Sequence, residues 1–125
     1  MSNNGYIIWS EEERIDLIKA YISVFEELCG LNHPRFWGHF TAVFNRTVRV
    51  NNNRDQLDVA AKWYEIKMEV VFFNDIYTNT EASRPNDSED VLLEAAKESY
   101  QCLTTNNHVF EHEECWKLMK DLPYF

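Results

Sequence analysis

The longest apolar pattern in the chain runs from Asn53 to Tyr77. Its main stripe repeats at alternating steps of four and three residues, at Val59, Trp63, Ile66, Val70, Phe73 and Tyr77. That spacing places the side chains on one face of an α-helix. A second apolar stripe runs beside it, at Ala60, Tyr64, Val71 and Phe72. We therefore predict a long helix that is buried between its neighbours, with Asn53 as its N-cap and Gln56 as the reciprocal partner.

Helical spacing and capping residues predict four more helices, giving helices near 10–29, 34–47, 54–77, 88–104 and 111–121. Ser10 and Glu13 have the spacing of a capping box, and Gly30 is expected to end the first helix. The stretch 78–87 is rich in Thr, Asn and Ser and is expected to be a loop. In the helix that follows, we expect an inward face made of Val91, Leu92, Ala95, Ala96, Tyr100 and Leu103.

Composition supports an all-α fold. The chain has 125 residues, the size of one ordinary domain, and only three glycines and three prolines, which leaves few tight turns for a many-stranded fold. Three cysteines are an odd number, and we expect Cys29 and Cys102 to be small buried hydrophobes in a reducing, intracellular compartment. No apolar run approaches the roughly 20 residues that a bilayer span requires.

The tryptophans show a family resemblance. Trp9 in the sequence W-S-E-E-E, the pair Phe36-Trp37, and Trp63 resemble the tryptophan framework of Myb/SANT-like domains, and the long third helix looks like the plant trihelix branch. The second half resembles the "no apical meristem-associated" region, at residues 88–92, Phe110, Cys115-Trp116, Leu118, Pro123 and Phe125. In plants this region follows such Myb-like domains, including those of relatives of the Myb-like accessory proteins of Harbinger-type transposons.

The resemblance implies a single domain, 1–125, with a three-helix core at 9–77 and a helical extension at 78–125. It also implies a core signature of Trp9, Trp37, Trp63 and Trp116. The function that it implies is that of a nuclear, non-enzymatic module in a transcription, chromatin or transposon-derived complex.

Charge favours a protein partner over DNA. The net charge is −9, and residues 53–77 hold three basic and five acidic side chains. Where the family commonly has Gln, Lys and Ser on its DNA-reading helix, this chain has Asp58, Ala60 and Ala61. An acidic helix repels phosphate, so we expect an adaptor that binds another protein.

DNA binding is the alternative, because residues 35–54 hold four arginines and no acid. Its candidate contacts are Arg46, Arg49, Arg54, Lys62 and Lys67.

The candidate surface for a protein partner lies in the second half. Residues 78–125 hold ten acidic and four basic side chains, and they end in an apolar tail. Glu111, Glu113 and Glu114, together with Tyr124 and Phe125, could receive a basic amphipathic segment. Alternatively, the two aromatic residues fold back and close the core.

The sequence predicts neither an enzyme nor a cofactor. His108, His112 and Cys115 have helical spacing, but no second close pair of ligands accompanies them, so we predict no metal site. The three scattered glycines form no nucleotide-binding loop, and Glu111, Glu113 and Glu114 fit a solvated capping turn. We expect no small-molecule substrate and no membrane association.

Overall fold

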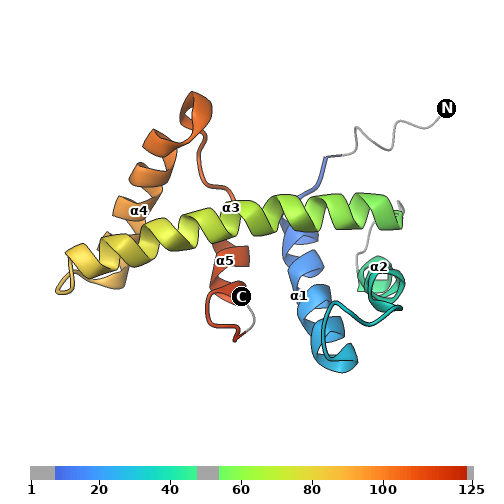
Figure 1. The fold of residues 1–125 in the computed structure, drawn as a ribbon. Helices are drawn as coiled ribbons and strands as arrows, with labels where there is room; N and C mark the ends of the chain where they lie inside the picture. The colour runs from blue at the N-terminus through green and yellow to red at the C-terminus, as the bar shows by residue number, and fades with distance from the viewer. Residues whose placement is uncertain (1–7, 48–53, 124–125) are drawn as a thin grey trace. The chain divides into compact units, whose positions relative to one another are not determined.

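A computed structural model describes residues 8–47 and 54–123. In these parts of the chain every regular element is helical, which confirms the all-α prediction. The elements follow the chain in order: α1 (Glu11–Leu28), α2 (Phe36–Thr47), α3 (Gln56–Ser83), α4 (Glu89–Leu103), the short 3-10 turn η2 (Thr105–Asn107) and α5 (Glu113–Met119) (Figure 1). The chain divides into two compact units, Met1–Glu65 and Ile66–Phe125, and the boundary between them falls within α3.

The first unit begins with the predicted capping box. The Ser10 hydroxyl accepts a hydrogen bond from the Glu13 amide at 3.1 Å, and the Glu13 carboxylate accepts one from the Ser10 amide at the same distance. At the other end of α1, Cys29 takes a left-handed conformation with φ 59°. Gly30 follows with φ 118° and donates its amide to the Phe25 carbonyl, so the helix ends where glycine makes a positive φ inexpensive.

Aromatic side chains fill the core of the first unit. Trp63 is buried and stacks on Tyr21, with ring centroids 3.6 Å apart. The Phe40 ring is perpendicular to the Trp63 ring and tilted relative to the Trp37 ring, with centroid distances of 6.5 and 5.8 Å. Trp37 is half-buried at the margin of this cluster. Trp9 is also half-buried and stacks on Phe44 at 5.4 Å.

Trp63 therefore lies in the core of the first unit, as expected, whereas Trp9 and Trp37 are half-buried at the edge of that core. The Myb/SANT assignment itself stays a prediction.

α3 starts and ends differently from the sequence prediction. The predicted cap Asn53 lies outside the described residues, and the Asp55 carboxylate accepts the Asp58 amide at 2.8 Å near the helix start. The predicted loop at 78–83 is wrong, because the helix continues to Ser83 (Figure 1). Thr80 and Ser83 donate their hydroxyls to carbonyls one turn back, at 2.8 and 2.9 Å, so these side chains are satisfied within the helix.

The second unit packs around Phe73 of α3. Phe110 stacks on Phe73 with ring centroids 4.0 Å apart, and Trp116 meets Phe73 edge-on at 5.2 Å. The Trp116 indole donates to the Asn74 side-chain oxygen at 2.9 Å. Trp116 is buried, in agreement with its place in the predicted core signature, and Cys115 beside it is buried as well.

Several apolar positions that the sequence placed inside are exposed. Tyr64, Val71 and Phe72, on the second stripe of α3, are 48%, 38% and 40% exposed, so that stripe is not buried as predicted. Cys29 and Cys102 are exposed as well, and the prediction that they are buried is wrong. On α3 the periodicity defines the middle of the apolar face correctly but overestimates its width.

Candidate functional site

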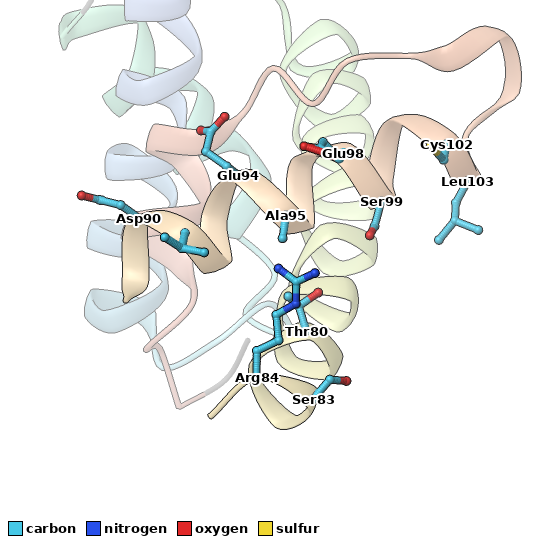
Figure 2. A pocket seen from close by; sticks show the side chains of 11 residues that line it. Thr80, Ser83, Arg84, Asp90, Glu94, Ala95, Glu98, Ser99, Cys102 and Leu103 are labelled. Atoms are coloured by element: carbon cyan, nitrogen blue, oxygen red, sulfur yellow. The ribbon is translucent and has the colours of Figure 1, made fainter. Parts of the chain in front are cut away.

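A hollow of the second unit lies between the end of α3 and the exposed face of α4 (Figure 2). Its volume is about 1080 Å³. We call it the α4 groove, and its lining residues are Thr80, Ser83, Arg84, Asp90, Val91, Glu94, Ala95, Glu98, Ser99, Cys102 and Leu103. An open hollow of this kind, with apolar and charged groups in its lining, is suited to a peptide segment.

The register of α4 explains why apolar side chains line the groove. Ser88 caps the helix by accepting the Val91 amide, and the face made of Leu92, Ala96 and Tyr100 is buried. Val91 lies beside that face and Leu103 is the last residue of the helix, and they are 49% and 65% exposed. The sequence prediction that they point into the core is therefore wrong. Val91 faces the solvent because the buried stripe of α4 is narrow, with one residue per turn, and Leu103 is exposed at the end of the helix.

One wall of the α4 groove is acidic. Asp90, Glu94 and Glu98 stand four residues apart, and this spacing aligns them along one side of α4. The opposite wall comes from the end of α3, where the half-exposed Arg84 side chain extends toward Ala95 (Figure 2). Arg84 has one weak internal ion pair, with Asp87 at 3.8 Å. The groove therefore has an apolar floor, an anionic wall and a single cation opposite.

The acidic residues proposed from the sequence as the partner surface are largely engaged within the second unit. Glu113 pairs with Lys97 of α4 and, at 3.2 Å, with Lys117, and these partners hold the pKa of its carboxyl below the usual value. Glu114 pairs with Lys117 at 3.4 Å. Glu111 is exposed, with His108 3.8 Å away. Tyr124 and Phe125 lie outside the described residues.

The basic residues proposed as DNA contacts have different surroundings. Arg54 is buried, its guanidinium donates to both carboxylate oxygens of Glu13 at 3.1 and 3.3 Å, and it lies over the Trp9 ring at 4.2 Å. Lys62 pairs with Glu65 at 2.9 Å. Arg54 therefore holds the first unit together, and a phosphate could reach it only by breaking the pair with Glu13.

The two remaining basic candidates among the described residues lie in different units of the chain. Arg46 is exposed at the end of α2, and Lys67 is half-buried on α3. Arg49 lies outside the described residues. The sequence alone does not distinguish the buried Arg54 from the exposed Arg46, because the burial of Arg54 depends on Glu13, a partner 41 residues away in the chain.

A polar cluster surrounds Glu69 in the second unit. The Tyr100 hydroxyl donates to Glu69 Oε1 at 3.4 Å, and the same oxygen lies 3.4 Å from His112 Nε2 and 3.6 Å from His108 Nε2. The two histidines named in the sequence analysis thus converge on one carboxylate that the sequence analysis did not single out. Buried His112 and its partner Glu69 tie the start of α5 to α3.

This cluster predicts an unusual titration. Burial, followed by the negative charge of Glu69 and the hydrogen bond to it, raises the pKa of Tyr100 to about 12 from 10.0. The folded state thus keeps a proton that the unfolded chain loses near pH 10. The stability that this difference in the pKa of Tyr100 contributes is complete below pH 10 and is lost as the pH rises from 10 to about 12. Absorbance at 295 nm should show a tyrosine that titrates near pH 12 and disappears in Tyr100→Phe; titration of every tyrosine near pH 10 in the folded protein would contradict this.

Comparison with protein families, with curated proteins and with solved structures finds no match for this chain. In the described parts, no helix is both long and apolar enough to cross a membrane.

Proposed function

We propose that the chain is a non-enzymatic interaction module whose second unit binds a segment of a partner protein in the α4 groove. The observation that supports this most is the exposure of Val91 and Leu103 in an open hollow. Burying a side chain of this size contributes about 1.5–3 kcal/mol, so two such side chains give a partner a substantial apolar anchor.

The sequence resemblance indicates the kind of complex in which we expect the partner to be found. A tryptophan framework like that of Myb/SANT-like domains supports an adaptor role in a nuclear transcription, chromatin or transposon-derived complex. The overall charge of −9 agrees with a protein partner, because it disfavours general attraction to nucleic acid.

The experiment compares proteins captured from plant nuclear extract by three forms of the chain. The groove variant combines Val91→Asp with Leu103→Asp. The control variant combines Leu57→Asp with Met68→Asp, which changes the charge equally at apolar side chains that are 81% and 72% exposed outside the groove. We expect a set of proteins that binds the parent and the control but is lost from the groove variant. If every captured protein binds all three forms equally, the α4 groove is not the interaction site.

DNA binding by this chain is expected to be weak. Arg54 is committed to Glu13, and Arg46 is the one fully exposed basic candidate in the described residues. A gel-shift assay with random-sequence duplex should therefore give at best micromolar, strongly salt-dependent binding. Arg46→Gln should weaken it further and reduce its salt dependence, and discrimination of one DNA sequence at nanomolar concentration would contradict the proposal.

A further inference from the structure

We infer that the occupant of the α4 groove is a basic amphipathic helix from another protein, with its cations along one edge. This inference depends on the proposed function, because it specifies the partner of that same groove. Its basis is the combination of an apolar floor with an acidic row on one wall only.

The acidic row is electrostatically unfavourable in the free protein. Like charges four residues apart on a helix repel each other by roughly 0.2–0.5 kcal/mol per pair. Glu94 is partly compensated by Lys97 at 3.4 Å, but among the described residues Asp90 and Glu98 have no ion pair. Cations from a partner would relieve this repulsion, so the wall is complementary to a row of lysines or arginines.

The dimensions of α4 define the length of the occupant. Its 15 residues extend about 22 Å at roughly 1.5 Å per residue, and the groove follows it from Asp90 to Leu103. A helix lying along it would contribute about four turns, or roughly 14 residues. Ala95 and Ser99 are small and lie between Val91 and Leu103 in the chain, which allows the occupant to approach α4 closely.

The two walls also define the orientation of the occupant's edges. Cations spaced four residues apart would meet Asp90, Glu94 and Glu98, and the apolar stripe would face Val91 and Leu103. The other edge would lie near Arg84, where a neutral or acidic side chain fits and a cation does not. This asymmetry distinguishes the occupant from a uniformly cationic peptide.

The test is a calorimetric titration of the full chain with three synthetic peptides of about 14 residues. The first is amphipathic, with leucines on one face, lysines along one edge and glutamines along the other. The second has glutamate in place of every lysine, and the third has the composition of the first in scrambled order. We expect the first peptide to bind at least about tenfold more tightly than either of the others, with affinity that falls as salt rises.

Groove variants locate the binding. Combined Asp90→Asn, Glu94→Gln and Glu98→Gln should weaken the first peptide about tenfold and flatten its salt dependence. The matched control neutralises three exposed acids of α1, with Glu11→Gln, Glu12→Gln and Glu26→Gln, and should bind like the parent. Equal loss in both triple variants would show attraction to net charge alone and overturn the inference.

Other outcomes separate the inference from the proposed function. Stronger binding of the acidic or the scrambled peptide, abolished by Val91→Asp with Leu103→Asp, would overturn the basic-helix occupant and leave the groove as an interaction site. Self-association of the parent chain that the groove variants abolish would replace the occupant with a second copy, whose residues 35–54 are basic. If no peptide binds while the groove still captures proteins from extract, the occupant is not a basic helix.

Discussion

Replacement of Arg54 by methionine is expected to destabilise the first unit by about 3–5 kcal/mol, because the Glu13 carboxylate would stay buried without its cation. The side chains of Arg54 and Glu13 are only 4% and 9% exposed, and their atoms lie 3.1 Å apart. Glu13 also completes the capping box of α1, so it cannot swing out to solvent without giving up a hydrogen bond to Ser10. The free energy of unfolding from urea titration, followed by circular dichroism, measures this loss.

Two further variants test whether the unpaired Glu13 carboxylate causes the loss of stability in Arg54→Met. Glu13→Gln combined with Arg54→Met removes both charges but keeps a side chain that can cap α1, so it should be more stable than Arg54→Met alone by on the order of 1–3 kcal/mol. Lys62→Met breaks a more exposed pair with Glu65 and should cost about 0.2–1 kcal/mol. Equal losses in Arg54→Met and Lys62→Met would show that burial of the Glu13 pair has no special effect.

The second large effect is expected from Trp63→Ala, which should lower the free energy of unfolding by about 3–5 kcal/mol. Trp63 is 2% exposed and stacks on Tyr21, so its removal leaves a cavity that the surrounding rings of α1 and α2 cannot fill. Met68→Ala is the matched control on the same helix. Because Met68 is 72% exposed, its truncation should change stability by no more than about 0.5 kcal/mol. A loss for Trp63→Ala as small as that for Met68→Ala would contradict its place in the core.

Helical periodicity predicted the helices of this chain well but not the width of their buried faces. Val59, Trp63 and Phe73 have the predicted spacing and are buried. Their neighbours on the second stripe of α3 are exposed, because burial requires a covering element as well as an apolar side chain. The same physical limit applies to Val91 and Leu103, which the sequence placed inside the core.

Turn-forming residues misled the prediction at the end of α3. Thr, Asn and Ser between residues 78 and 83 are typical of loops, yet they extend the helix here. The hydroxyls of Thr80 and Ser83 donate to carbonyls of the preceding turn. The helix ends only before Arg84-Pro85, where proline disfavours helical geometry in the preceding residue. That extension forms one wall of the α4 groove, so the error in the element also concealed the site.

The sequence places the candidate partner surface at Glu111, Glu113 and Glu114, whereas the groove that we propose is lined by other acids of the second half of the chain. Glu113 and Glu114 are engaged with Lys97 and Lys117, which no composition argument could reveal. Asp90, Glu94 and Glu98 were visible as a four-residue repeat. Their significance depends on the exposure of Val91 and Leu103 beside them, and the structure supplies that information.

Binding of the basic amphipathic peptide in the α4 groove is tested most directly by the rate of cysteine alkylation with and without that peptide. Cys102 lies in the α4 groove and is exposed, exposed Cys29 lies in the first unit, and buried Cys115 reports on the integrity of the fold. At a peptide concentration ten times the Kd, we expect alkylation of Cys102 to slow about tenfold while Cys29 reacts as before and Cys115 stays protected. Unchanged reactivity of Cys102 at that concentration, or equal slowing of Cys29, would contradict binding in the α4 groove.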